Sequence, residues 1–156
     1  MAPDGPRLPQ TETSSPIVCR PGEGTRVVTL AAETTIKVRP DQTAGAYAIL
    51  EQLIPADHGP PLHVHRHETE VFYILEGQFE ITLGSQRQAA PPGSLVVAPP
   101  DIPHTFHNVG PSPGRLLLTI IPGRFAGFFL DSDGVDPNDR ATLKTLCARY
   151  DVQILA

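Results

Sequence analysis

The sequence predicts a single all-β domain. Three observations indicate this: many short apolar runs rich in Val, Ile, Leu, Phe and Thr, an excess of proline, and Gly, Pro, Asp or Asn between the runs. The 18 prolines among 156 residues are roughly twice the usual share of about 5%. Proline can neither donate to a sheet ladder nor continue a helix, so it collects at turns and strand ends. This length suits one domain with a substantial core.

The expected strands follow one another with short turns between them, such as Glu76-Gly77-Gln78. Residues 79–83 alternate apolar and polar side chains, which predicts one buried face and one solvent face. Residues 71–75 and 116–121 are apolar on both faces, as expected between packed sheets or in a closed barrel. The expected strands are Arg26–Ala31, Thr34–Val38, Tyr47–Ile54, Leu62–His65, Glu70–Leu75, Phe79–Leu83, Gln86–Ala90, Leu95–Ala98, His104–Asn108 and Arg115–Ile121.

Near the C-terminus the pattern changes to that of an amphipathic helix over residues 137–150. Asp136 is the expected cap and Pro137 suits the first turn. One apolar stripe at helical spacing comprises Leu143, Leu146, Cys147 and Tyr150. We interpret Cys147 as an inert core residue and expect a short strand at Val152–Leu155. The segment Phe125–Leu130 is either a second short helix or a lid over a cavity mouth, and the pattern leaves both open.

Composition excludes several function classes. The net charge is −5 with no cluster of Lys or Arg, so the positive footprint of nucleic-acid binding is missing. The longest apolar run, Leu116–Ile121, is too short to span a bilayer. With only Cys19 and Cys147, neither a disulfide framework nor a cysteine zinc site is available. The first residues lack the apolar core of a secretion signal. We therefore expect a flexible arm at 1–24, one domain at 25–156 and a cytoplasmic location.

The stretch HVHRHETEVFYILEG, residues 63–77, is the strongest chemical signal. In a strand, residues i and i+2 share a face, so His63 and His65 point together. Glu70 has the opposite parity, and a bend within 66–69 is needed to bring it beside them. Downstream, His104 follows a proline-bounded turn at the start of a strand. Three imidazoles and a carboxylate at one point suit one divalent ion of Fe, Mn, Co, Ni, Cu or Zn, with coordination positions left open.

This stretch and GSLVVAPPDIPHTFHN, residues 93–108, resemble the two signature motifs of the cupin superfamily. The matching positions are His63, His65, Glu70 and Gly77 in the first motif, and Gly93, Pro99, His104 and Asn108 in the second. Asp101 replaces the second motif's central glycine, and Asp tolerates the left-handed backbone that such a turn needs. The first motif's initial glycine falls on Asp57. A register using His65 and His67 would place that glycine on Gly59, but it leaves only two residues before Glu70.

The resemblance implies an antiparallel double-stranded β-helix, or jelly-roll barrel, with a core over about residues 34–121 and a metal inside it. The ligands carried over are His63, His65, Glu70 and His104. Strand parity indicates candidate pocket residues: Phe72, Ile74 and Phe106 share the face of Glu70 and His104, although ordinary core packing explains them equally well. Dimerisation is common in this superfamily, so a homodimer is expected.

The sequence also resembles small cupins related to quercetin 2,3-dioxygenase, in HVHRHETEVFYILEGQFEI and in ARYDVQIL near the end. It implies an oxidoreductase, quercetinase-like and acting on a small aromatic or enolic molecule. Glu70 would act as the general base if it left the metal. Two alternatives stay open: a non-redox metal-dependent isomerase, cyclase or decarboxylase, and a cupin that binds a small ligand without catalysis.

Other polar residues of these motifs have simpler interpretations. His67 and Glu68 are expected in a solvated turn, and His58 in a surface loop. His107 is expected on the outer face. Asn108 is expected to close a turn through side-chain to backbone hydrogen bonds. A cupin whose polar core binds no metal is the remaining alternative for the four ligand positions.

Overall fold

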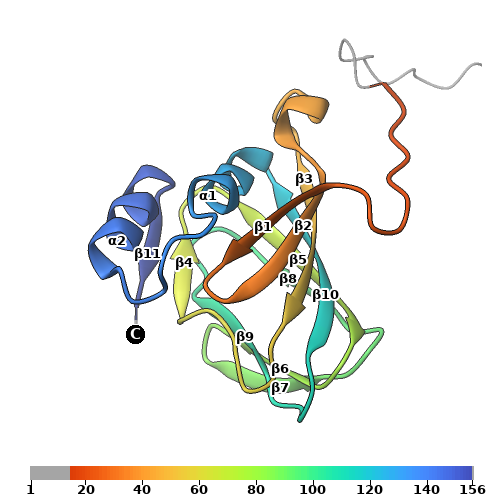
Figure 1. The fold of residues 1–156 in the computed structure, drawn as a ribbon. Coiled ribbons are helices and arrows are strands. Elements are labelled where there is room, and N and C mark those ends of the chain that lie inside the picture. The colour runs from red at the N-terminus through yellow and green to blue at the C-terminus, as the bar shows by residue number, and fades with distance from the viewer. Residues whose placement is uncertain (1–14, 156) are drawn as a thin grey trace, which may run out of the picture.

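The structure is a computed structural model that describes residues 15–155, and it confirms the predicted all-β jelly roll (Figure 1). The strands form two antiparallel sheets facing each other. In order across the first sheet lie β1 (Thr25–Thr29), β2 (Ala32–Val38), β3 (Ala48–Ile54), β10 (Gly114–Ile121), β5 (Thr69–Glu76) and β8 (Leu95–Ala98). Across the second lie β11 (Val152–Ile154), β4 (His63–His65), β9 (His104–Asn108), β6 (Phe79–Leu83) and β7 (Gln86–Ala90).

Alternation along the strands places the core between the two sheets. In β10 every second residue from Gly114 to Ile120 is buried, and their neighbours are only partly buried. In β6 the buried residues are Phe79 and Ile81, as the alternation predicts. Because side chains in a strand point alternately to opposite faces, each sheet contributes its inward set to one shared core.

Two aspartates occupy turns that require a left-handed backbone. Asp101 has a φ of 63° and Asp57 a φ of 53°, and these are the two positions where the cupin motifs carry glycine. Asp is one of the few residues with a side chain that adopt this conformation at low cost. Gly59 cannot be replaced as easily, because a Cβ there would lie 2.0 Å from the carbonyl oxygen of Phe106.

Asn108 fastens the end of β9 to neighbouring loops. Its side chain is fully buried, and Nδ2 donates to the carbonyls of Ile54, Pro55 and Ser112 at 3.1, 3.1 and 2.9 Å. Its Oδ1 accepts from the amide of Gly110 at 3.0 Å. The structure therefore shows the turn-closing role expected from the sequence.

The C-terminal part covers one open end of the sandwich (Figure 1). The segment left undecided by the sequence contains a 3-10 turn (Gly123–Phe125) and helix α1 (Ala126–Asp131), which buries Phe128 and Phe129. Helix α2 (Arg140–Arg149) is shorter than the predicted 137–150, and its cap is Asp139, not Asp136. Asp139 accepts from the amide of Thr142, whereas Asp136 binds Asn138 in the turn before the helix. Strand β11 then pairs with β4.

The domain division expected from the sequence stays a prediction. Residues 1–14 of the expected arm lie outside the described residues, and residues 15–24 form neither helix nor strand before β1 begins at Thr25. A short 3-10 helix, η1 (Pro40–Thr43), connects β2 to β3. Among the described residues, no helix combines the length and apolar character needed to cross a membrane.

Candidate metal centre

The fold brings His63, His65, Glu70 and His104 together. One ligand atom from each lies within 4.8 Å of those of the other three, and all four residues are buried. The three histidines come from β4 and β9 of one sheet, where His63 and His104 are directly opposite each other. Glu70 comes from β5 of the facing sheet. Residues 66–68 form a bend between β4 and β5. This bend, expected from the sequence within 66–69, brings the Glu70 side chain to the same side as His63 and His65.

Backbone carbonyls orient two of the histidines. His63 Nδ1 donates to the carbonyl of Pro61 at 2.8 Å, and His104 Nδ1 donates to that of Ile102 at 2.9 Å. With Nδ1 carrying a proton, Nε2 is the nitrogen that faces the other ligands. Burial lowers the pKa of His63 to about 4, so its ring is neutral near pH 7 and its Nε2 lone pair is available to a cation.

Glu70 lies between the other two imidazoles. His104 Nε2 donates to Glu70 Oε2 at 3.0 Å, and His65 Nε2 lies 3.5 Å from Glu70 Oε1. Burial opposes the charged carboxylate, but its electrostatic attraction to His65 and the hydrogen bond from His104 outweigh this and lower the pKa of Glu70. Burial likewise opposes the charged form of His104, yet the hydrogen bond to Glu70 raises the pKa of this imidazole. The group thus combines an ionised carboxylate with the neutral imidazole of His63.

These residues fit a divalent transition metal. Imidazole nitrogens and a carboxylate oxygen are the donor set that first-row ions prefer. Both ring nitrogens of His65 are buried and without a hydrogen-bond partner among residues 15–155. An unsatisfied buried nitrogen is costly, and a cation between His65 and its neighbours would satisfy Nε2. The proton of His104 that now lies between Nε2 and Glu70 is the one that a cation would displace.

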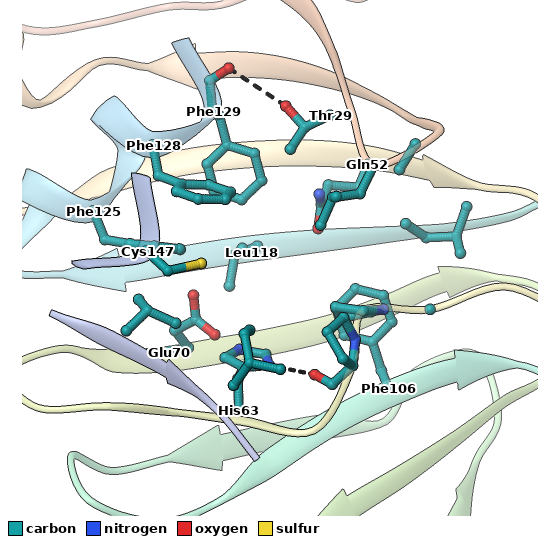
Figure 2. A pocket seen from close by; sticks show the side chains of 18 of the residues that line it. Thr29, Gln52, His63, Glu70, Phe106, Leu118, Phe125, Phe128, Phe129 and Cys147 are labelled. Atoms are coloured by element: carbon teal, nitrogen blue, oxygen red, sulfur yellow. Dashed lines mark hydrogen bonds between the residues drawn. The ribbon is translucent and has the colours of Figure 1, made fainter. Parts of the chain in front are cut away.

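A cavity of about 260 Å³ opens beside Glu70 and His63 (Figure 2). Three aromatic rings from the segment before and within α1 form one wall, and α2 and β11 contribute at the C-terminal side. The aromatic residues are Phe125, Phe128 and Phe129. The volume lies slightly below the range of about 300–1,000 Å³ typical for sites that bind drug-sized ligands. The cavity is therefore suited to a small and largely apolar molecule.

Two of the three predicted pocket residues line this cavity. Phe72 and Phe106 do so, with ring centroids 5.5 Å apart, and Phe72 lies 5.9 Å from the ring of His104. The prediction for Ile74 is wrong, because this side chain is fully buried in the core and is not part of the cavity wall. Ile74 shares the parity of Glu70, but it is two residues beyond Phe72, about 7 Å further along the strand.

Polar side chains are few in the cavity wall. Thr29 donates to the carbonyl of Phe129 at 3.4 Å, and His58 Nε2 contacts the carbonyl of Leu30 at 2.6 Å. Gln52 is 5% exposed, and its Nε2 donates to Thr34 Oγ1 at 3.1 Å. Its Oε1 accepts no hydrogen bond from any described residue, and the amide reaches toward the cavity in Figure 2.

Several sequence-based interpretations need correction here. Glu68 is not a solvated turn residue, since it is 2% exposed and lies against His65. His58 is half-buried and lines the cavity instead of standing in a surface loop. Cys147 packs against the core, as the sequence predicted, but it is only partly buried and also lines the cavity; burial raises the pKa of its thiol. His67 is exposed, as expected, and His107 contacts Asp57 on the outside.

Strand alternation could have predicted the buried positions of Glu68 and Gln52. Glu68 shares the parity of Glu70, so alternation places it on the inward face if β5 is extended by one residue backward. For Gln52 the pattern of β3 gives the same answer, because it alternates with the outward Glu51 and Leu53. For the aromatic wall the sequence left open a short helix or a lid over a cavity mouth at Phe125–Leu130, and the structure shows a short helix whose aromatic side chains line the cavity.

Comparisons with known proteins agree with this architecture. Residues 49–120 match the family described as "Cupin domain". The chain is 27% identical over 114 residues to quercetin 2,3-dioxygenase of Bacillus subtilis, covering 73% of this chain and 34% of that protein. It is 31% identical over 75 residues to an uncharacterized protein of Methanocaldococcus jannaschii, covering 48% of this chain and 60% of that protein. The chain therefore spans less than two thirds of the length of either relative.

A solved structure shares the fold at low sequence identity. The crystal structure of a predicted oxalate decarboxylase from Thermotoga maritima superposes with a TM-score of 0.62 and 19% identity. The match covers 68% of this chain and 99% of that one. At this identity the likeness supports the jelly-roll fold and carries no information about the reaction.

Proposed function

We propose that the protein is a metal-dependent oxidoreductase, because residues 49–120 match the family described as "Cupin domain" and the chain is similar to quercetin 2,3-dioxygenase. The proposed reaction is a quercetinase-like dioxygenation of a small aromatic or enolic molecule. The observation that carries the proposal is a buried group of three histidines and one glutamate at the wall of an apolar cavity. A structural polar cluster has no need of such a cavity beside it.

His63, His65, Glu70 and His104 would hold the ion. When bound, a divalent transition metal supplies Lewis-acid polarisation of a substrate oxygen and, for redox-active ions, electron transfer. The protein's own contribution is a fixed donor set and a cavity from which its aromatic wall excludes water. Exclusion of water strengthens every polar interaction inside the cavity.

Glu70 has two proposed roles that place opposite demands on it. As a ligand it must be ionised, and its lowered pKa meets that demand. A general base near neutral pH works best with a pKa close to the operating pH. Glu70 therefore acts as a base only after leaving His104 and His65, the contacts that lower its pKa.

Gln52 supports a substrate with a second polar group. The amide oxygen is the polar atom that a ligand would meet in an otherwise apolar part of the wall. A hydroxyl of the substrate could donate to it, as the outer hydroxyls of a polyphenol would. Replacing Gln52 by Leu keeps the side-chain volume and removes this acceptor. The variant should weaken binding of hydroxylated phenols about 5- to 15-fold, the effect of one hydrogen bond of about 1–1.5 kcal/mol, while phenols lacking the second hydroxyl bind as before.

The test is oxygen consumption by protein loaded separately with Fe, Mn, Co, Ni or Cu. The panel contains quercetin, small mono- and dihydroxyphenols and 1,3-diketones such as pentane-2,4-dione. We expect oxygen uptake with one of these classes, and its loss in Glu70→Gln but not in Glu80→Gln, whose side chain binds Arg87 on the far side of the sheet. If fully metal-loaded protein consumes no oxygen with any member of the panel, the dioxygenase proposal is wrong.

A second candidate is a non-redox enzyme that uses the same ion only as a Lewis acid. The donor set, which suits the redox-inactive ion Zn as well as Fe or Ni, favours keeping it. Substrate loss without oxygen uptake, with Zn as effective as Fe or Ni, would support this candidate. Binding of a ligand that stays unchanged would instead support the non-catalytic alternative.

We also propose the homodimer and the cytoplasmic location that the sequence led us to expect. The outer face of the six-stranded sheet supports a dimer, because Leu53, Tyr73, Val97 and Ile121 are 37, 41, 45 and 44% exposed there. Burying such a surface against a second copy would be favourable. Analytical ultracentrifugation of the wild type and of Tyr73→Lys tests it: a monomeric wild type would contradict the proposal.

A further inference from the structure

Glu68 is a buried carboxylate that the four-ligand arrangement does not use. It is 2% exposed, and its Oε2 has no hydrogen-bond partner among the described residues. Within residues 15–155 its only ion-pair neighbour is His65, whose Nδ1 lies 3.7 Å from Oε2. Burying a carboxylate without a partner is costly, so its position against a proposed metal ligand calls for an explanation beyond packing.

The three imidazoles are supported differently on the side away from the centre. In His63 and His104, Nδ1 donates to the carbonyl of the residue two positions earlier, Pro61 and Ile102. His65 has no such carbonyl among the described residues, since both of its ring nitrogens lack a hydrogen-bond partner. Glu68 lies where that acceptor would be. The carboxylate therefore occupies, for the third imidazole, the place that backbone carbonyls fill for the other two.

The packing around His65 limits which groups its ring nitrogens can contact. Its ring contacts Phe125 edge to face, with centroids 4.3 Å apart, and the imidazole is 1% exposed. Its Nε2 faces Glu70 at 3.5 Å. The imidazole thus lies between two carboxylates, one on each nitrogen, with a phenyl ring against its side. The distance from Nδ1 to Glu68 is about 0.5 Å longer than the usual upper limit of about 3.2 Å for a hydrogen bond, a gap that a small side-chain rotation closes.

We infer that Glu68 is a positioning residue for the metal centre: it accepts the Nδ1 proton of His65 and so directs the Nε2 lone pair into the site. Carboxylate partners of this kind orient a ligating imidazole and make it a stronger donor. His65 would then be the strongest of the three imidazole donors, because its partner carries a charge and the other two partners are neutral. The inference rests on metal binding by His65, and it is independent of which reaction the centre performs.

The test compares Glu68→Gln, which keeps an acceptor of the same length without the charge, with Glu68→Leu, which removes the acceptor. Glu80→Gln on β6 is the matched control. Dissociation constants for Co²⁺ and Zn²⁺ are measured by competition with a chromogenic chelator, together with the visible absorption of the Co²⁺ form and the melting temperature of the chelator-treated protein.

We expect Glu68→Leu to weaken binding of both ions about 10- to 100-fold and Glu68→Gln to weaken it less. The Co²⁺ absorption bands should shift in Glu68→Leu, and Glu80→Gln should match the wild type. The melting temperature without metal should stay the same or rise in both variants, because Nδ1 and Oε2 are 3.7 Å apart in this structure, too far for a hydrogen bond, and the cost of burying the carboxylate is removed.

A purely structural role predicts the opposite stability change. If both variants melt lower without metal while the dissociation constants and the Co²⁺ spectrum stay within twofold of the wild type, the inference is overturned. Because metal binding is read directly, this result is distinguishable from failure of the proposed oxidation, in which the ion binds normally and no oxygen is consumed.

Discussion

Replacing Asn108 by Leu should destabilise the fold strongly, because one buried amide connects four backbone groups. Its Nδ2 donates to the carbonyls of Ile54, Pro55 and Ser112, and its Oδ1 accepts from Gly110. Leu has a similar volume but neither donor nor acceptor. All four backbone groups would lose their partner at a site that water does not reach, because Asn108 is 0% exposed.

The expected loss follows from the number of bonds. Each hydrogen bond contributes about 1 kcal/mol net, so four contribute about 4 kcal/mol. Burial of the apolar Leu side chain offsets part of this loss, so the free energy of unfolding should fall by about 3 kcal/mol. Against a total stability of about 5–15 kcal/mol, the change is large. For a chain of this size it corresponds to a fall of about 6–12 °C in melting temperature.

Urea unfolding followed by circular dichroism measures the change, with Asn138→Leu as the matched control. Asn138 is exposed, and its side chain bonds only to Asp136 among the described residues, so its replacement should change the free energy of unfolding by less than about 0.5 kcal/mol. A loss below about 1 kcal/mol for Asn108→Leu, or equal losses for both variants, would refute the reasoning.

Three further predictions concern turns and metal. Gly59→Ala should lower the free energy of unfolding by about 1–3 kcal/mol or more in urea titrations, because its Cβ meets the Phe106 carbonyl oxygen at 2.0 Å; an unchanged midpoint would contradict the close approach. Asp101→Gly should stay within about 1 kcal/mol of the wild type, whereas Asp101→Val should lose about 1–2 kcal/mol at this left-handed position; equal midpoints would argue against it. Zn²⁺ or Ni²⁺ at 100 times its dissociation constant should add about 2.7 kcal/mol, or about 5–11 °C, and a chelator should reverse the shift; no shift would argue against the site.

The strands were predictable because the sandwich buries one face of most of them. In β6 and β10 the alternation of apolar and partly exposed residues follows the pleat. Glu70 was correctly assigned to the inward face because its parity could be reconciled with His63 and His65 only through a bend. Asp101 was also interpretable, since few residues with a side chain tolerate its backbone conformation.

The rest depended on tertiary packing that no local pattern encodes. Helix α2 begins at Arg140 because the side chain of Asp139, not that of Asp136, accepts a hydrogen bond from the amide of Thr142 in the first turn. The sequence around Glu68 resembles a solvent-exposed turn. It therefore gave no indication that this carboxylate is buried and lies 3.7 Å from His65 Nδ1. Phe125 is over the centre because the 3-10 turn at Gly123–Phe125 and helix α1 fold back across the end of the sandwich. Contacts between residues distant in sequence determine this placement.

The most direct test of the central claim is the metal content of His65→Gln beside that of His67→Gln. The two residues are two positions apart, but His65 is 1% exposed within the proposed centre and His67 is on the surface. After reconstitution with Zn²⁺ or Ni²⁺ and removal of loosely bound ions, elemental analysis should find about one ion per chain in the wild type and in His67→Gln, and much less in His65→Gln. A wild type without bound metal, or equal metal content in the two variants, would contradict a centre built from His63, His65, Glu70 and His104.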